Sequence, residues 1–218
     1  MRILILANGD PPSLELAHRC AAEHDLLIAT DGAAHQAAAL GLSPGIICGD
    51  FDSIRLDAAR LEFPNAEFLP TPNQEQADLE KAILVAREHG ATAITLLGAS
   101  GDRMDHTLAN FALLLRYHTE ISLCLRDNLT TTWAVSGPGE HRGELILTTE
   151  PGDTISLVSF GGTARVSLSG VQWPLYDERL TIGTRGVSNV ALAHEVKVQA
   201  QRGAIFVFHL HTANRTDF

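Results

Sequence analysis

The stretch GIICGDFDS, residues 45–53, places two aspartates one residue apart, directly after a short apolar run. A short apolar run that glycine and aspartate close is typical of a strand buried on both faces. Such strands belong to parallel sheets, and open parallel sheets bind their ligands beyond the carboxyl ends of the strands. Asp50 and Asp52 are therefore either turn residues or ligands of a metal ion, and the rest of the sequence has to decide between the two.

Runs of the same kind recur through the first part of the chain, and helical patterns lie between most of them. The β-rich runs are 2–7, 26–30, 45–48, 66–69, 93–98 and 121–125, and the helical patterns are 13–23, 32–41, 73–90 and 105–118. In the third helical pattern, Asn73 and Gln76 have the spacing of a capping box. Apolar strands that alternate with helices predict an open, Rossmann-like α/β domain, in which helices cover both faces of a parallel sheet in three layers.

After Asp127 the pattern changes to short runs that are rich in β-branched residues and separated by glycine, proline and aspartate. Several of these runs alternate polar with apolar residues, as TARVSLSG does at residues 163–170. Short strands at regular spacing predict a small antiparallel sandwich or barrel. We therefore expect an α/β domain at residues 1–126 and a β-sandwich domain at residues 127–218.

Composition and charge exclude several classes of protein. The 218 residues suffice for one large or two small domains, and 45% hydrophobic with 19% charged residues is typical of a globular chain. A net charge of −10 argues against nucleic-acid binding, which needs clustered lysine and arginine. The cysteines, at positions 20, 48 and 124, form no CxxC pattern, which favours reduced thiols in a cytoplasmic protein. No apolar stretch approaches the roughly 18–20 residues that cross a bilayer, so no membrane partner is expected.

Polar residues follow each predicted strand of the first domain, and several of them are acidic. They include Asn8 after the first strand, Asp31 and Gly32 after the second, and Asp50 and Asp52 after the third. Crowded carboxylates repel one another unless a cation neutralises them, and Mg²⁺ prefers carboxylate and phosphate oxygens. The set therefore predicts a metal–nucleotide site. Asp31 alone would be read as a helix cap, and the aspartate pair alone fits a turn and a metal site equally well.

The predicted helix at 73–90 adds a further acidic group. Asp78 lies beside its apolar stripe rather than with Glu80 and Lys81, which we expect on the solvent side, and Glu75 is three residues earlier on the same face. An acidic group at the edge of an apolar stripe suggests a ligand role. We therefore add Asp78 to the predicted site.

The segment GASGDRMDH, residues 98–106, supplies groups that suit a phosphate. Gly98 and Gly101 permit close approach of the backbone to a phosphate, and the helix that follows offers free N–H groups. The planar guanidinium of Arg103 can donate two hydrogen bonds to phosphate oxygens. Asp102 and Asp105 have the spacing of a helix cap, and His106 is a base, a phosphate ligand or a structural histidine. Farther along, His209 and His211 alternate with a leucine and have no other metal ligand nearby in the sequence, so we expect strand residues on a solvated face.

These segments together resemble the thiamine pyrophosphokinase family. The segments that carry the resemblance are DGA at 31–33, GDFDS at 49–53, QEQADLEKA at 74–82, GDRMDHTLAN at 101–110, GVQWPL at 170–175 and TRGVSN at 184–189. The resemblance implies that the pyrophosphoryl group of ATP moves to the hydroxyethyl oxygen of thiamine, giving thiamine diphosphate and AMP. It also implies a homodimer whose active site lies at the subunit interface.

The resemblance implies a role for each matching residue. The Mg²⁺ ligands are Asp50, Asp52 and Asp78, which act in catalysis together with Arg103. The nucleotide contacts are Asn8, Asp31, Gly32, Gln76, Gly98, Gly101, Arg103, Asp105 and His106. The thiamine contacts are Trp173, Ser188 and Asn189. Without the resemblance, Trp173 is equally well read as a core aromatic residue and Ser188–Asn189 as a turn.

The chain departs from the family pattern at two positions, since Ala77 stands where a threonine is usual and Glu75 where an aspartate is frequent. A hydroxyl contact from position 77 is therefore lost. Two other functions stay open on the sequence alone. One is pyrophosphoryl transfer to another hydroxymethyl heterocycle, such as a pterin, and the other is a non-catalytic nucleotide sensor.

Overall fold

The computed structural model describes residues 1–52, 54–101, 103–137 and 143–211, and the chain divides into two compact units. The first unit comprises Met1–Leu113 and Ile121–Asn128, and the second comprises Leu114–Glu120 and the chain from Leu129 onward. The end of helix α5 (Met104–Tyr117) therefore groups with the second unit. Sequence patterns did not indicate this, because the helical period runs through the division without a break.

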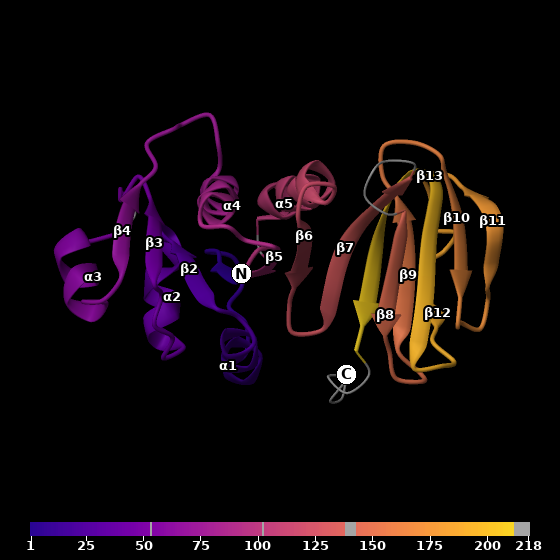
Figure 1. Ribbon diagram of the computed structural model, residues 1–218, viewed down its shortest axis with the longest axis horizontal. Helices are drawn as coiled ribbons and strands as arrows, with labels where there is room; N and C mark the ends of the chain where they lie inside the picture. Colours follow the sequence, from indigo (N-terminus) through magenta and orange to yellow (C-terminus); the bar gives the residue numbers. More distant parts are fainter. Residues whose placement is uncertain (53, 102, 138–142, 212–218) are drawn as a thin grey trace. The chain divides into compact units, whose positions relative to one another are not determined.

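The first unit contains a parallel sheet with the strand order β4-β3-β2-β1-β5-β6 (Figure 1). The strands are β1 (Arg2–Leu6), β2 (Leu26–Thr30), β3 (Ile46–Gly49), β4 (Glu67–Pro70), β5 (Ala93–Leu97) and β6 (Ser122–Arg126). In the central strand β1, the side chains from Ile3 to Leu6 are fully buried, as both faces of the sheet are covered. Four successive buried apolar side chains fit the central position of β1 in the sheet.

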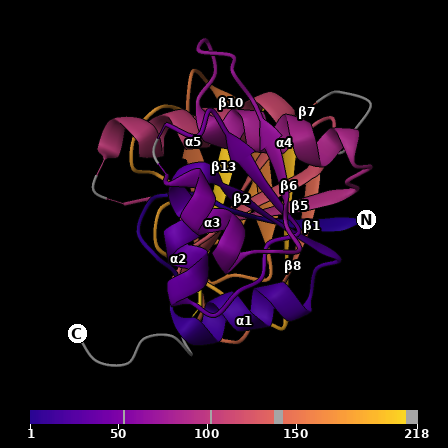
Figure 2. The same ribbon diagram turned by 90° about the vertical axis from the view of Figure 1, so that its left-hand side faces the viewer.

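Helices cover both faces of this sheet, which confirms the predicted three-layer α/β fold. Helices α1 (Leu14–Ala22) and α2 (Ala34–Ala39) lie on one face, and α4 (Asp78–Glu88) and the beginning of α5 lie on the other (Figures 1 and 2). Ser13 caps α1 as its sequence predicts, because its hydroxyl accepts a hydrogen bond from the backbone N–H of Leu16 at 3.2 Å.

The structure differs from the predicted elements of this unit at two helices. Helix α3 (Leu56–Glu62) was not predicted, and it buries none of its residues, so it carries no apolar period to detect. Helix α4 begins at Asp78 rather than near Asn73. The Asn73 side-chain amide instead donates to Gln76 Oε1 at 3.0 Å and accepts a hydrogen bond from the Glu75 backbone N–H at 2.9 Å. These two hydrogen bonds make a local turn and not a helix cap.

The second unit is antiparallel, and its longest strand belongs to two sheets. The strands are β7 (Thr130–Gly137), β8 (Glu144–Thr148), β9 (Thr154–Ser159), β10 (Ala164–Ser169), β11 (Leu175–Leu180), β12 (Asn189–Val190) and β13 (Glu195–Leu210). The first half of β13 pairs with β8 and β10, and its second half pairs with β7 and β9. The predicted runs EVKVQAQ and AIFVFHL are thus one strand, and one core lies between the two sheets, as in the predicted sandwich.

Strand β13 changes sheets at Gly203, which adopts a left-handed φ of 74°. A Cβ atom there would lie 2.7 Å from the Thr163 carbonyl oxygen. Only glycine satisfies both the dihedral angle and the close approach. In the described ranges of both units, no helix is long and apolar enough to cross a membrane.

The core of the second unit can be tested with tryptophan fluorescence, because both tryptophans of the chain, Trp133 and Trp173, belong to this unit. Ile205 is fully buried in its core, so we expect Ile205→Ala to lower the free energy of unfolding by about 2–5 kcal/mol. Ile182 is 71% exposed, so Ile182→Ala should change this free energy by less than about 0.5 kcal/mol. Equal effects of the two substitutions in urea titrations would contradict the assigned core.

Candidate nucleotide and metal site

A cavity of about 600 Å³ opens at the carboxyl ends of the strands in the first unit. Its lining comes from the segments after β1, β2, β3 and β5, from the turn before α4 and from the start of α5. Of the residues predicted to contact nucleotide or metal, those that line it are Asn8, Gly32, Asp50, Asp52, Gln76, Asp78, Gly98, Gly101, Arg103 and His106. The fold thus brings together side chains that are far apart in the sequence, at the edge where parallel sheets bind ligands.

Glycines bring two strand-end segments into backbone contact at the floor of this cavity. The Gly9 N–H donates to the Gly98 carbonyl oxygen at 2.6 Å, and the Asp10 N–H donates to the Ser100 carbonyl oxygen at 2.8 Å. A Cβ atom at Gly9 would collide with the carbonyl oxygen of Ser100. A side chain at Gly9 would therefore push the two segments apart. The shape of the cavity thus depends on glycine at this position.

Asp31 holds the neighbouring backbone in place and is not among the residues found to line the cavity. Its side chain is buried and accepts hydrogen bonds from the backbone N–H groups of Gly32 at 2.7 Å and Phe51 at 2.8 Å. Burial raises the pKa of this carboxyl, and the two N–H donors oppose that shift. The nucleotide contact of Asp31 stays a prediction, and the neighbouring Gly32 lines the cavity.

The same carboxylate explains the glycine that begins the acidic turn. A Cβ atom at Gly49 would collide with the carboxyl group of Asp31. Phe51 adopts a left-handed φ of 62°, which is costly for a residue with a bulky side chain, and its N–H is the group that Asp31 binds. Asp31 therefore fixes the turn that presents Asp50 and Asp52. Ser53, the last residue of the GDFDS segment, lies outside the described residues.

Carboxylate oxygens of Asp31, Asp50 and Asp52 all lie within 4.8 Å of one another. The Gln74 side chain donates to Asp50 Oδ2 at 3.0 Å, and this hydrogen bond is the main reason why the pKa of Asp50 is lowered. Asp50 is thus held in its charged form next to two other acidic groups. Several anionic oxygens in such proximity suit a hard divalent cation of the Mg²⁺ type.

Asp78 lines the same cavity but is not in this close group. It is the first residue of α4, and its Oδ1 atom lies 2.9 Å from the Nζ atom of Lys81. The Lys81 side chain is only 5% exposed, and Glu80 is also buried, so the expectation that both face solvent is wrong. Glu75, which was expected to share a helix face with Asp78, is in the preceding turn and exposed.

Lys81 is the functional candidate that the sequence analysis missed. It lines the cavity with a cationic group close to the carboxylates, where it can bind the oxygens of a polyphosphate. The available signal was its spacing of three residues from Asp78, which permits an ion pair on one helix face. That signal is weak, because the same spacing is common on solvated surfaces.

Arg103 and Asp105 form a bidentate ion pair at the start of α5. Arg103 Nε donates to Asp105 Oδ1 at 2.9 Å and Nη2 donates to Oδ2 at 2.7 Å, which holds the pKa of Asp105 well below its usual range. Asp105 is therefore a partner of Arg103 and not one of the residues found to line the cavity. The predicted cap at Asp102 lies outside the described residues.

The predicted thiamine residues form a separate group in the second unit. The Asn189 side chain accepts a hydrogen bond from the Trp173 backbone N–H at 3.1 Å and donates to the Trp173 carbonyl oxygen at 2.6 Å. Asn189 is buried, whereas Trp173 is 57% exposed, so the interpretation of Trp173 as a core residue is wrong. Ser188 is exposed at a left-handed φ of 64°. Asn189 thus holds in place the segment that presents the indole ring.

Two family models of known proteins match successive parts of the chain. The family model described as the catalytic domain of thiamin pyrophosphokinase matches residues 17–125, and the one described as its vitamin B1 binding domain matches residues 144–205. A Bacillus subtilis thiamine pyrophosphokinase is 30% identical over 166 residues, which cover 74% of this chain and 76% of the relative. Thiamin pyrophosphokinase 1 of Caenorhabditis elegans is 26% identical over 95% of this chain and 89% of its own length.

Solved structures share the fold over nearly the whole chain. A thiamine pyrophosphokinase from Bacillus subtilis superposes with a TM-score of 0.81 at 23% identity, covering 97% of this chain and 99% of that one. A thiamin pyrophosphokinase from Candida albicans superposes with a TM-score of 0.82 at 14% identity, covering 96% and 88%. At these identities the structural likeness establishes the fold alone.

The contact between Asp31 and Gly49 predicts a coupled pair of substitutions. Gly49→Ala should lower the free energy of unfolding by about 1–3 kcal/mol, because its methyl group displaces the Asp31 carboxylate. In an Asp31→Ala background the colliding carboxyl group is absent, so the same substitution should cost less there. Urea titrations of the four proteins, followed by far-UV circular dichroism, measure this coupling. Additive effects would show that the two residues do not constrain each other.

Proposed function

The chain belongs to the thiamin pyrophosphokinase family, and from this membership we propose that it transfers the pyrophosphoryl group of ATP to the hydroxyethyl oxygen of thiamine. The products are thiamine diphosphate and AMP. One observation supports the donor in particular, namely that a lysine, several carboxylates and glycine-lined backbone gather in a single cavity of the first unit. This combination suits a triphosphate with its cation better than it suits an uncharged ligand.

We propose Mg²⁺ as the cation, held by Asp50, Asp52 and Asp78. The donor set fits this ion, because all three side chains line the cavity and offer hard anionic oxygens. Lys81 Nζ lies 2.9 Å from Oδ1 of Asp78, so a cation would share this carboxylate with the lysine. When bound, the ion supplies positive charge to the phosphate oxygens as negative charge grows during transfer. Asp31 acts as a positioning residue that fixes the turn carrying Asp50 and Asp52.

The protein groups in this proposal act by orientation and electrostatics. Phosphoryl transfer needs an attacking oxygen aligned with the phosphorus atom and compensation of the developing charge, and it needs little covalent chemistry from the enzyme. Lys81 and Arg103 both line the cavity and are the proposed cationic donors to the phosphates. Arg103 enters this role already oriented, because Asp105 holds its guanidinium at two atoms. Asn8, Gln76 and His106 complete the proposed nucleotide contacts.

For the thiamine side, we propose that Trp173 contacts the rings of the acceptor, since its indole is exposed and can stack on an aminopyrimidine or a thiazolium cation. Asn189 holds that segment through two hydrogen bonds to the Trp173 backbone, and Ser188 and Asn189 are further proposed contacts to thiamine. We also propose a homodimer with the active site at the subunit interface, which several exposed apolar side chains of the second unit favour. They include Phe160, Ile146 and Leu192. A cytoplasmic location remains a prediction, in keeping with the free cysteines.

The donor and acceptor can be tested in a single assay that follows AMP. The purified protein is incubated with ATP, Mg²⁺ and thiamine, and we expect AMP and thiamine diphosphate in equal amounts. AMP formed only with a hydroxymethyl pterin would replace the acceptor and leave the donor. Tight ATP binding without AMP from any acceptor would favour a nucleotide sensor and contradict the proposed reaction.

The metal role of the acidic turn predicts a specific loss of activity. Asp52→Asn removes an anionic oxygen from the proposed Mg²⁺ site, so turnover should fall by roughly 10²–10³-fold while the circular dichroism spectrum is retained. Asp57→Asn is the matched control, because Asp57 is an exposed aspartate of α3 that does not line the described cavity. If Asp52→Asn turned over as fast as this control, Asp52 would not be a ligand.

The exposed indole predicts an effect on the acceptor alone. Trp173→Ala should raise the KM for thiamine by about tenfold, the equivalent of losing one stacking contact, and leave the KM for ATP unchanged. Tyr176→Ala removes another aromatic side chain, 76% exposed, from the same unit and should change neither value. Steady-state kinetics with each substrate varied in turn separates the two constants. A rise in both, or in neither, would argue against a thiamine contact at Trp173.

A further inference from the structure

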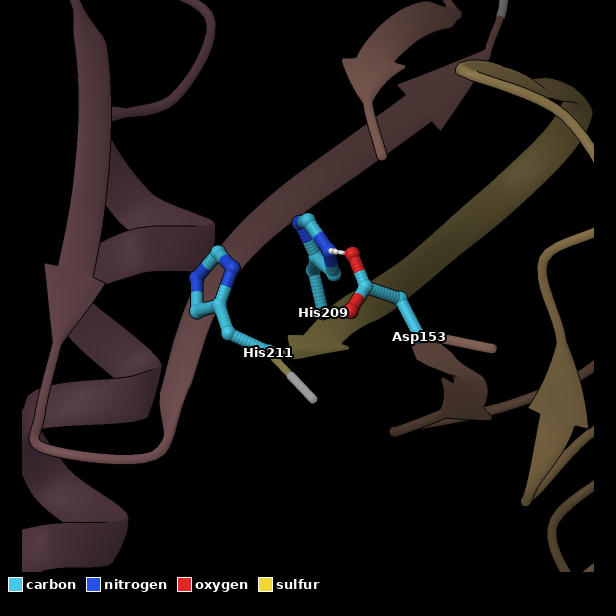
Figure 3. Close-up of side chains that lie close together, drawn as sticks. All are labelled: Asp153, His209 and His211. Atoms are coloured by element: carbon cyan, nitrogen blue, oxygen red, sulfur yellow. Dashed lines mark hydrogen bonds and ion pairs between the residues drawn. The ribbon is translucent and has the colours of Figure 1, made fainter. Parts of the chain in front are cut away.

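The second unit contains a group of metal-ligand side chains that the proposed reaction does not use. Asp153, His209 and His211 each offer one ligand atom, and these three atoms lie within 4.8 Å of one another (Figure 3). Asp153 and His209 are each 3% exposed, and His211 is half-buried. The group belongs to the second unit alone, so it is independent of the cavity in the first unit.

The pairing of β13 with β9 creates this group. Leu210 of β13 pairs with Thr154 of β9, and this register brings Asp153 next to the end of β13. The expectation that His209 lies on a solvated face without a further ligand nearby is therefore wrong. The missing ligand comes from a position 56 residues earlier in the chain, which no local pattern could indicate.

The geometry within the group is tight. His209 Nε2 lies 2.7 Å from Asp153 Oδ2, and the same oxygen accepts the backbone N–H of Glu150 at 2.9 Å. The centroids of the two imidazole rings are 4.1 Å apart, and His211 Nε2 lies 3.1 Å from the hydroxyl oxygen of Thr131 on β7. Three adjacent strands thus hold the donors in place.

We propose that Asp153, His209 and His211 bind one divalent transition-metal ion of the Zn²⁺ type. Two imidazoles with one carboxylate are a donor set that suits Zn²⁺, whereas Mg²⁺ prefers oxygen ligands. Tetrahedral Zn²⁺ with ligand bonds of about 2.0–2.1 Å sets its ligand atoms roughly 3.3 Å apart, so the donors need only small movements. Binding displaces the proton that His209 and Asp153 share in their hydrogen bond.

A structural hydrogen bond between His209 and Asp153 is the simpler interpretation, and it does not explain His211. A buried imidazole–carboxylate pair is complete without a second imidazole 4.1 Å away. His211 supplies the third donor that a metal needs, and it follows β13 directly, two positions after His209. Three protein ligands leave one coordination position, which we assign to water.

The ion would connect the end of β13 with the start of β9, and Thr131 extends the contact to β7. Because the ligands come together only in the folded unit, metal binding should stabilise that unit by mass action. We expect saturating Zn²⁺ to raise the unfolding temperature by roughly 5 °C or more.

The test uses Co²⁺ and then Zn²⁺ on the untagged, full-length protein carrying Asp52→Asn, so that binding at the acidic cavity is suppressed. We expect one Co²⁺ per chain with the strong visible absorption of a four-coordinate ion, displaced by one equivalent of Zn²⁺. His211→Gln in the same background should weaken Zn²⁺ binding by about 100-fold. His194→Gln is the control, because its imidazole lies 3.3 Å from a Glu150 carboxylate oxygen yet is 75% exposed, and it should bind as the parent does.

Circular dichroism establishes that the His211→Gln protein is folded before its affinity is compared. The absence of stoichiometric Co²⁺ and Zn²⁺ binding to the parent would contradict the proposal, as would equal affinities of the two histidine variants. If His211→Gln does not fold, the thermal shift of the parent decides, and no rise in its unfolding temperature with Zn²⁺ would also overturn the site. None of these outcomes depends on thiamine pyrophosphokinase activity.

Discussion

Repulsion between carboxylates at one edge of a parallel sheet is the constraint on which the first unit depends. Asp31, Asp50 and Asp52 lie within reach of a common ion, and Asp78 faces the same cavity. Like charges at such distances destabilise a fold unless hydrogen bonds, a lysine or a cation compensate them. This unit uses backbone N–H donors on Asp31, an amide on Asp50 and Lys81 on Asp78. The proposed Mg²⁺ and the phosphates would complete the compensation.

Backbone packing makes this crowding possible. The glycines at positions 9 and 98 let two strand ends touch, and Gly49 gives the buried Asp31 carboxylate room beneath the acidic turn. Different residues therefore position the site and form it. Asp31 is buried and fixes the turn, while Asp50 and Asp52 face the cavity. A similar separation holds in the second unit, where buried Asn189 holds the segment that exposes Trp173.

Sequence patterns predicted the strands and helices that have a local apolar period, and they predicted the polar residues that follow the strands. The apolar runs gave the parallel strands, and the polar residues after them gave most of the cavity lining, because strand ends meet at one edge whatever their order. Contacts set by tertiary packing could not be predicted in this way. Helix α3 buries no residue, Lys81 turns inward from a face that its neighbours suggested was polar, and His209 meets Asp153 only through strand pairing. Helix α3 thus has no apolar period, Lys81 had only the weak signal of its spacing from Asp78, and the partner of His209 is 56 residues away.

The two units are proposed to bind ions of different chemistry: oxygen ligands hold a phosphate-bound cation in the first, and imidazoles hold a Zn²⁺-type ion in the second. The proposed reaction depends on the cation of the first unit. Anomalous scattering from a crystal grown with Mn²⁺ and a non-hydrolysable ATP analogue tests it most directly. We predict a peak within bonding distance of Asp50 and Asp52, with the phosphates beside Lys81. Phosphates bound in the cavity with no metal at these carboxylates, or a metal bound elsewhere in the first unit, would contradict the proposed metal site.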